Sequence, residues 1–204
     1  MIKRSSKHYI DKLIKHNPDW KILDIGCGYT AHERASVVCD IKDLSEFYKD
    51  KKFIKLENET LPFNNNEFDF VISSHVIEHV KNVDKFINEL QRISSKGYIE
   101  LPSILEDNLV FENKKDHLWH CKFDDDKNNL LISKRVQYIE PILTVSSIKN
   151  FSKFFRESLI LELYWENSIE YKVLDEDVSF EKISRLSLLR KFISKLLRNI
   201  IRKN

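Results

Sequence analysis

The sequence predicts an α/β protein built on a doubly wound, mostly parallel sheet. Short apolar segments alternate with segments whose apolar residues recur at helical spacing, which is typical of a parallel sheet covered on both faces. The most informative segment is Lys-Ile-Leu-Asp-Ile-Gly-Cys-Gly at residues 21–28, which holds two of the three glycines of the chain. Glycine after an apolar strand permits a positive φ and a close approach of the backbone to a ligand.

Length and composition indicate one domain of ordinary size. The chain has 204 residues, of which 42% are hydrophobic, and no apolar run approaches the ~20 residues of a membrane span. The first residues lack the apolar segment of a signal peptide, and three separated cysteines favour a reducing compartment over a disulfide framework. We therefore expect a cytoplasmic protein.

The expected elements alternate in type up to residue 101. In chain order they are helix 5–16, strands 21–25, 36–40, 53–56 and 68–73, helix 82–95, and strand 98–101. Asn17-Pro18 stops the first helix, and Gly97 is expected to end the second. The four strands before the second helix and the strand after it form the predicted parallel sheet.

The second half of the chain departs from this alternation of strands and helices. Residues 102–140 are rich in charge and asparagine and predict an insertion, in which strands 119–123 and 130–133 pair across a turn. A helix over 145–157 follows. Residues 159–165 and 169–174 are then expected to form a C-terminal antiparallel hairpin.

The last 24 residues differ in charge from the rest. Residues 181–204 carry eight Lys or Arg residues and one acidic residue, whereas the other 180 residues are net acidic. Apolar residues recur in this tail at three- to four-residue intervals, which predicts a basic amphipathic helix after a domain at 1–180. The tail suits an anionic membrane surface at the inner membrane face, or else a solvated face of a docked helix. The acidic body makes nucleic acid an unexpected partner.

The residues around the glycines narrow the choice of ligand. Asp24 would oppose the doubly negative pyrophosphate of a dinucleotide. The dinucleotide fingerprint also expects its ribose-binding acid about 20 residues after the first glycine, whereas the acid that ends the next strand, Asp40, comes too early for a full crossover helix. A cationic ligand removes the objection. S-adenosylmethionine carries a sulfonium and an ammonium group, so Asp-x-Gly-x-Gly favours it.

Three motifs in this order resemble the class I S-adenosylmethionine-dependent methyltransferases, most closely the type 11 group. They are residues 22–28, the segment Leu-Pro-Phe-x4-Phe-Asp-Phe-Val-Ile-Ser at 61–73, and His-Val-Ile-Glu-His-Val at 75–80. The resemblance covers about 80 residues well and implies a Rossmann-like methyltransferase fold. It also implies methyl transfer from S-adenosylmethionine, which we expect to act on a small-molecule or lipid-linked glycan acceptor. The alternative is a non-catalytic methyltransferase-like module that binds a partner through its tail.

The resemblance also implies a cofactor site at the carboxyl ends of the strands. Asp24, Gly26 and Gly28 would hold the methionine end of the cofactor, and Asp40 would accept hydrogen bonds from the ribose hydroxyls. Glu57 and the backbone at Asn58 would face the adenine, and the carbonyl of Ser74 would contact the amino group of the cofactor. One departure is clear. Only residues 29–35 separate the glycine loop from the next strand, where the family has a full helix, and Arg34 in this loop is a candidate partner for the cofactor carboxylate.

Four histidines are candidate general bases for the acceptor, because an imidazole titrates near neutral pH. They are His75, His79, His117 and His120. Each has a structural alternative as a packing or surface histidine. The sequence His75-x-x-Glu78-His79 also matches a zinc-peptidase pattern, so a zinc hydrolase that recruits His117 or His120 is a further alternative. Because no third ligand follows at a defined spacing, no metal site is assigned.

Overall fold

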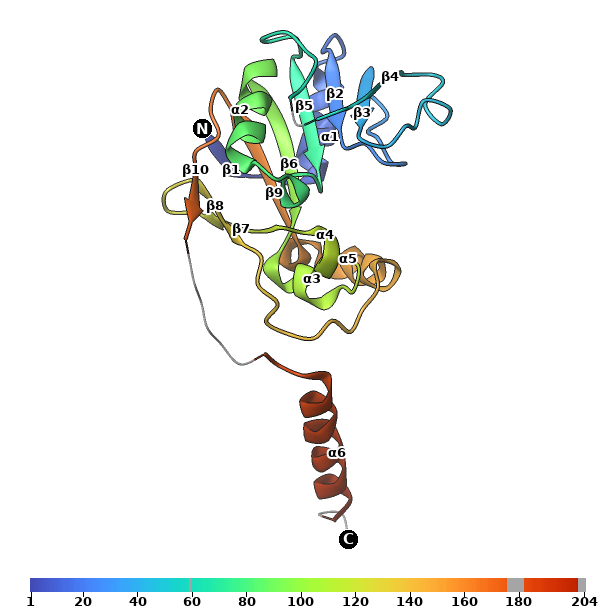
Figure 1. The fold of residues 1–204 in the computed structure, drawn as a ribbon, viewed down its shortest axis with the longest axis vertical. Helices are drawn as coiled ribbons and strands as arrows, with labels where there is room; N and C mark the ends of the chain where they lie inside the picture. Colours follow the sequence, from blue (N-terminus) through green and yellow to red (C-terminus); the bar gives the residue numbers. More distant parts are fainter. Residues whose placement is uncertain (59, 176–181, 202–204) are drawn as a thin grey trace.

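A computed structural model describes residues 1–58, 60–175 and 182–201. Its centre is a seven-stranded sheet in the order β1-β9-β6-β5-β2-β3-β4 (Figure 1). Five adjacent strands are parallel, namely β6 (Lys96–Pro102), β5 (Phe70–Ser74), β2 (Ile22–Ile25), β3 (Val37–Asp40) and β4 (Lys52–Lys55). β9 (Ile160–Glu166) runs antiparallel to β6, and β1 (Ile2–Arg4) runs antiparallel to β9. The prediction of a mostly parallel α/β sheet is confirmed.

Helices cover both faces of this sheet. On one face, α1 (Lys7–His16) packs Ile10 and Ile14 into a cluster with residues of β2, β3 and β5. On the other face, α2 (Val83–Ile93) buries an apolar stripe against β2, β5 and β6. Both helices begin at side-chain caps, because Ser6 and Asn82 accept hydrogen bonds from backbone N–H groups of the first turn. The short 3₁₀ helix η1 (Ile77–His79) precedes α2 and follows β5 directly.

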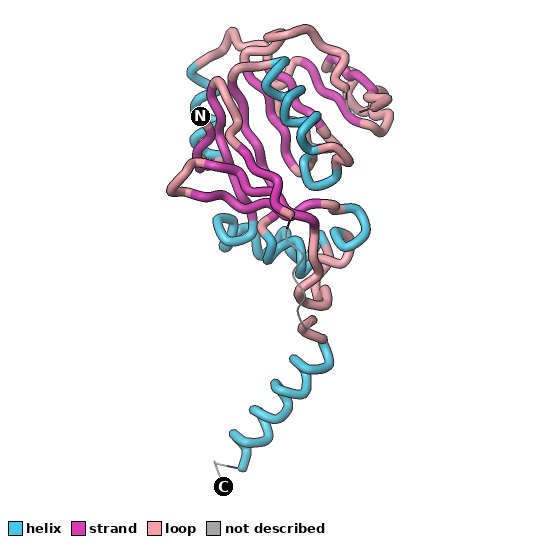
Figure 2. The backbone as a smooth tube through the Cα atoms, turned by 60° about the vertical axis from the view of Figure 1, so that its left-hand side comes forward, coloured by secondary structure: helices cyan, strands magenta, loops and turns pink. Residues whose placement is uncertain are grey.

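The insertion between β6 and β9 builds a second, smaller layer. It contains α3 (Ile104–Leu109), α4 (Asn113–Asp116), β7 (Trp119–Asp124), β8 (Asn129–Lys134) and α5 (Val145–Leu159). β7 and β8 pair antiparallel, as predicted, and β10 (Tyr171–Leu174) completes a three-stranded sheet, visible in Figure 2. Residues of β7 and β8 join the same apolar cluster as α2. The insertion therefore shares a core with the main sheet.

The expected hairpin of residues 159–165 and 169–174 is wrong. β10 pairs in parallel with β8, and β9 lies between β6 and β1 in the other sheet. Both edges of β9 are thus occupied, so no edge is left for β10. The three-residue strand β1 was too short to be recognised from the sequence, yet it takes the outer place that the hairpin was expected to fill.

The expectation that Gly97 ends a helix is also wrong. The second helix ends at Ile93, with Ser94 as its cap, and Gly97 lies inside β6. A Cβ at residue 97 would lie 2.0 Å from Cη2 of Trp165 and 2.3 Å from the carbonyl oxygen of Val71. Glycine at this position makes room for the fully buried indole ring of β9.

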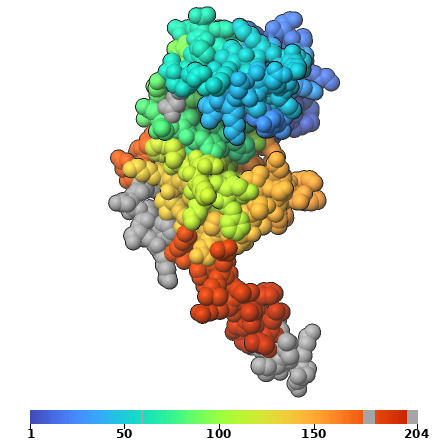
Figure 3. All heavy atoms as spheres, turned by 45° about the vertical axis from the view of Figure 1, so that its right-hand side comes forward, coloured from blue at the N-terminus to red at the C-terminus, as the bar shows by residue number. Residues whose placement is uncertain are grey.

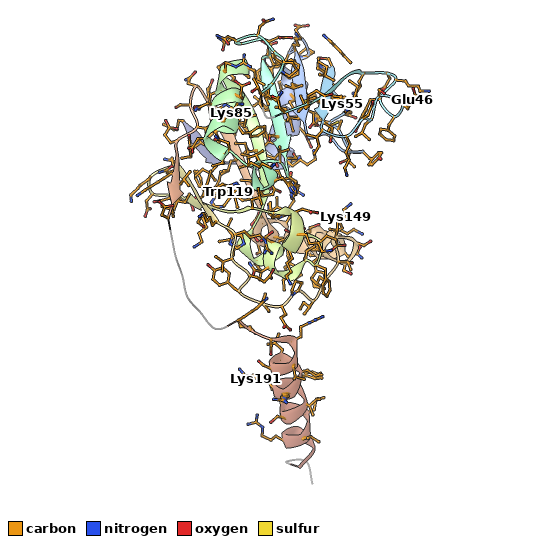
Figure 4. All side chains as sticks on the ribbon, in the orientation of Figure 1. Glu46, Lys55, Lys85, Trp119, Lys149 and Lys191 are labelled. Atoms are coloured by element: carbon orange, nitrogen blue, oxygen red, sulfur yellow. The ribbon has the colours of Figure 1, made fainter. Side chains whose placement is uncertain are left out.

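The basic tail forms the helix α6 (Arg185–Ile201). Ile183 forms a bridge with Ile139, and the helix then projects away from the body (Figures 1 and 3). Side chains of α6, Lys191 among them, extend into open space (Figure 4). Its apolar side chains from Leu186 to Leu197 are exposed, with Phe192 at 61%. Among the described residues, no helix is both long and apolar enough to cross a membrane. Residues 176–181 and 202–204 of the predicted tail and its boundary lie outside the described residues.

Candidate functional site

A glycine loop follows β2 at the carboxyl end of the sheet. Gly26 and Gly28 have φ angles of +65° and +48°, which other residues rarely adopt. A Cβ on Gly26 would lie 2.4 Å from Cγ2 of Val76, whereas a Cβ on Gly28 would meet nothing within 4 Å. Gly26 is therefore needed for packing. The backbone of Gly28 faces open space that a ligand can approach closely.

A cavity of about 410 Å³ opens beside this loop. Its lining includes Asp24, Gly26, Gly28 and Ser74, which are four of the seven residues that the sequence assigned to the cofactor, together with the candidate base His75. The volume falls within the roughly 300–1,000 Å³ of small-molecule sites. The cavity lies at the carboxyl ends of parallel strands, where open α/β sheets bind their ligands.

Asp24 gives the cavity its electrostatic character. Its side chain is buried, and its Oδ2 accepts a hydrogen bond of 2.7 Å from the backbone N–H of His32. Burial raises the pKa of Asp24 to about 6 despite this hydrogen bond. Among the described residues, no cationic side chain forms an ion pair with Asp24. A ligand with a positive charge would supply the missing partner, so the site fits S-adenosylmethionine.

Asp40 fixes the glycine loop through hydrogen bonds to backbone N–H groups. Its Oδ2 accepts a hydrogen bond from the backbone of Gly28 and its Oδ1 accepts one from the backbone of Lys42, each of 2.9 Å. Asp40 is not part of the cavity lining, but carboxylate oxygens can accept further hydrogen bonds. It stands at the end of β3, as the assignment to the ribose requires.

The predicted departure at residues 29–35 is present, since this loop contains no helix. Tyr48 holds the backbone of this loop in place. Its hydroxyl donates to the carbonyl of Gly28 at 2.9 Å and accepts from the backbone N–H of Ala31 at 3.0 Å. Arg34 does not reach the cavity and donates instead to the carbonyl of Pro18. The expected role of Arg34 is therefore not supported by its position.

Two other cations, Lys7 and Arg156, line the cavity instead. Arg156 donates to Glu100 at 2.6 Å and to Glu162 at 3.0 Å, and the Tyr98 hydroxyl contacts both carboxylates. Burial alone would raise the pKa of Glu100, but its hydrogen-bonded and cationic partners lower it to about 2. No motif marks Arg156 in the sequence. Only the packing of α5 against β9 brings it to the cavity.

Glu57 and Asn58 lie after β4, outside the lining of this cavity. Glu57 is exposed and its Oε1 is 3.6 Å from Nζ of Lys55, while Asn58 accepts a hydrogen bond from the backbone of Thr60. Their assignment to the adenine remains a prediction. The structure places them at the strand end that the assignment requires and gives them no contact with the other site residues.

Residues 23–99 match the family described as "Methyltransferase domain". This range contains the glycine loop, Asp40 and Ser74. The match is consistent with a class I S-adenosylmethionine-dependent methyltransferase. It is 27% identical to an uncharacterized protein of Methanocaldococcus jannaschii, over 74% of the chain and 77% of that protein. It is also 27% identical to the ubiquinone biosynthesis O-methyltransferase of Rickettsia typhi, over 82% of the chain and 68% of that protein. A solved structure from Pyrococcus horikoshii superposes with a TM-score of 0.45 at 15% identity, covering 79% of this chain and 92% of the other.

His75 is the one candidate base of this methyltransferase that borders the cavity. Its Nδ1 lies 3.2 Å from Glu78 Oε1 and its Nε2 lies 3.4 Å from Glu100 Oε1. Burial acts to lower the pKa of His75, but the two carboxylates raise it. Its backbone is held at a φ of +55°. Both ring nitrogens face carboxylates, which favours a protonated imidazolium over a base.

The other three candidate histidines gather around the insertion. The rings of His79 and His117 meet edge to face with centroids 4.6 Å apart. His117 Nδ1 contacts Asp107 Oδ1, and His120 Nε2 lies 2.7 Å from Asp107 Oδ2. Burial alone would raise the pKa of Asp107, but these histidines and Arg135 lower it to about 2. His120 is buried behind Asp107, so the structure brings His79 and His117 together and leaves His120 apart.

The zinc-peptidase arrangement is not formed. In that pattern two histidines on one helical face bind the ion and the glutamate serves as base. Here His75 lies before η1 rather than within it, and its imidazole contacts the carboxylate of Glu78. The hydrolase alternative is therefore not supported by the geometry.

Proposed function

We propose that this methyltransferase transfers a methyl group to a hydroxyl of a small-molecule or lipid-linked glycan acceptor. The observation that carries the proposal is the buried Asp24 carboxylate, which lacks a cationic partner among the described residues and lines a cavity beside the open backbone of Gly28. The Rickettsia relative is named for methyl transfer to oxygen, which supports a hydroxyl as acceptor.

The residues around the cavity suggest a division of roles. S-adenosylmethionine, when bound, supplies an electrophilic methyl group on a sulfonium. Asp24 would attract the positive charges at the methionine end of the cofactor. Arg156 or Lys7 would pair with the carboxylate of the cofactor. Asp40 would accept hydrogen bonds from the ribose. Because methyl transfer largely neutralises charge, most of the rate enhancement would come from holding the acceptor oxygen in line with the methyl group.

The acceptor proton requires a base, and His79 or His117 is better placed for this role than His75. Both nitrogens of His75 face carboxylates, and His120 is buried. His79 is exposed and in ring contact with His117. We therefore propose that the acceptor lies between the cavity and the pair of His79 and His117. His75 borders the cavity and contacts Glu78, which is next to His79 in the chain.

The tail supports a lipid-linked acceptor. α6 contains no acidic residue, and its apolar side chains from Leu186 to Leu197 are exposed. Each Lys or Arg near an anionic surface adds about 1 kcal/mol to membrane binding. The helix would thus place the enzyme at an anionic bilayer where a lipid-linked acceptor resides.

Calorimetric titration with S-adenosylhomocysteine tests the core of the proposal. We expect one site per chain, and no binding at millimolar ligand would refute the enzyme assignment. A separate test concerns the tail. A variant ending at Ser184 keeps the bridge at Ile183; it should bind the ligand normally and lose affinity for anionic vesicles in a salt-dependent manner. Equal vesicle binding by the full chain and this variant would rule out the membrane role.

A further inference from the structure

A cluster of three possible metal ligands lies next to the cofactor cavity. Glu78 and His79 come from η1, and His117 follows α4, so residues far apart in sequence converge. One ligand atom from each lies within 4.8 Å of the others. We propose that Glu78, His79 and His117 form a binding site for a divalent transition-metal ion.

The backbone fixes the three ligands relative to one another. Leu118 donates to the carbonyl of Glu78 at 2.7 Å, and the indole of Trp119, labelled in Figure 4, donates to the carbonyl of Val80 at 2.8 Å. These bonds join η1 to the start of β7 on either side of the cluster. The two segments that carry the ligands are thus held together by hydrogen bonds to main-chain carbonyls.

The hydrogen bonds of the two histidines orient their rings for metal binding. Nδ1 of His79 lies 2.9 Å from the carbonyl of Asp116, and Nδ1 of His117 contacts the carboxylate of Asp107. A carbonyl and a carboxylate can only accept, so each Nδ1 carries the proton and each Nε2 presents a lone pair. Histidine ligands of metals commonly have such a partner on the second nitrogen.

Asp107 is itself held rigidly in this supporting role. The side chain is 1% exposed, and its Oδ2 lies 2.7 Å from Nε2 of His120 and 2.7 Å from Nε of Arg135. Three cationic or proton-donating groups thus surround one carboxylate. His120, which the sequence suggested as a base, instead belongs to this support.

Glu78 supplies an independent indication of an absent partner. The residue is 1% exposed, its Oε1 faces His75, and its buried Oε2 has no hydrogen-bond partner among the described residues. A buried carboxylate oxygen without a partner is unfavourable, because its desolvation is not compensated. A cation bound by Oε2 and the two Nε2 atoms would remove this cost.

The donor set selects the kind of ion. Two imidazoles and one carboxylate suit zinc and related transition ions, whereas magnesium and calcium prefer oxygen ligands. Ion–ligand distances of about 2.0–2.2 Å place ligand atoms roughly 3–3.5 Å apart, so side-chain shifts of about 1 Å would close the site. His79 is exposed, which leaves a coordination position open to solvent. An acceptor hydroxyl would occupy this position, where the ion would lower its pKa and its proton would pass to water. This consequence rests on the proposed methyl transfer, and with the ion bound His79 and His117 would act as ligands and not as bases.

Metal binding by the full chain tests the site directly. The protein is freed of metal with a chelator and titrated with Zn²⁺ in a calorimeter, and with Co²⁺ by visible absorption. We expect one equivalent bound with a micromolar or lower Kd. His79→Ala, at an exposed position, should weaken binding at least 100-fold, and Glu78→Gln, which keeps the side-chain shape, should do the same. Asp107→Asn should weaken it by about 10–100-fold, as for other supporting partners of histidine ligands.

His16→Ala is the matched control, because His16 is exposed at the end of α1. It should bind zinc as the unmodified chain does. Equal affinity of His79→Ala and His16→Ala, with circular dichroism showing both folded, would overturn the site, as would binding weaker than millimolar by the unmodified chain. Titration of metal-free protein with S-adenosylhomocysteine keeps the two proposals apart, since that ligand would still bind if only the metal site were wrong.

Discussion

Replacement of Asp24 by asparagine should stabilise the ligand-free protein while it weakens cofactor binding. The Asp24 carboxylate is 5% exposed and its pKa is raised from 3.8 to about 6. Above pH 6 the folded protein must therefore hold a buried charge that the unfolded chain solvates freely. Asparagine has the same shape, retains an oxygen that can accept from the N–H of His32, and carries no charge.

The magnitude follows from linkage between protonation and folding. A folded-state pKa above the unfolded value gives stability that is present at low pH and lost as the pH rises from 3.8 through 6. At 1.36 kcal/mol per pKa unit, the full penalty is about 3 kcal/mol at pH 8 and about 1.6 kcal/mol at pH 5. The variant should therefore be the more stable protein at both values, by a margin that grows with pH.

Urea denaturation of both proteins at pH 5 and pH 8, without cofactor, measures this margin. Asp50→Asn, at an exposed position, is the control and should change the free energy of unfolding by less than about 0.5 kcal/mol at either pH. The same Asp24→Asn protein should lose roughly 1.5–3 kcal/mol of affinity for S-adenosylmethionine, the cost of losing a charged partner. A variant that is less stable than the unmodified chain at pH 8, or a margin independent of pH, would refute the reasoning.

Three further predictions concern the same site and its support. A cationic ligand lowers the pKa of Asp24 from about 6, so binding of S-adenosylmethionine at pH 6 should release a fraction of a proton. Calorimetry in two buffers of different ionisation enthalpy measures this proton release. A binding enthalpy that is the same in both buffers would contradict the prediction. Asp40→Ala should weaken binding of S-adenosylhomocysteine by roughly 1.5–3 kcal/mol, whereas the exposed Asp43→Ala should not; equal affinities would reject the role of Asp40. Gly97→Ala should destabilise the fold by about 1–3 kcal/mol through overpacking against Trp165, and a thermal midpoint unchanged from that of the unmodified chain would show that β6 can yield.

The sequence predicted the parallel part of the sheet well, because buried parallel strands are apolar runs that end at recognisable polar residues. β2 and β3 lie within about one residue of their expected bounds and end next to Gly26 and at Asp40. The motif residues Asp24, Gly26, Gly28 and Ser74 meet at one cavity for the same reason, since strand ends adjoin in a parallel sheet.

What the sequence did not show depends on contacts between distant segments. β1 has three residues and no periodicity, so only its pairing with β9 defines it. Arg156 reaches the cavity because the end of α5 leads directly into β9. His117 and His120 are three residues apart and looked equivalent in the sequence. The ring of His117 meets that of His79, whereas His120 is buried against Asp107, and this difference follows from how the insertion folds back on η1.

The outer edge of the main sheet has a consequence for how the chain acquires its structure during synthesis. β1 is made before the rest of the sheet, yet β9, its strand partner among the described residues, is made after the whole insertion. Until β9 is made, residues 2–4 lack the strand with which they pair, and the free edge of β6 is open to pairing with other chains. Such late, long-range pairing slows folding and lengthens exposure to aggregation. Expression at reduced temperature, or with a chaperone that shields nascent chains, should therefore raise the yield of folded protein more than changes on the exposed surface would.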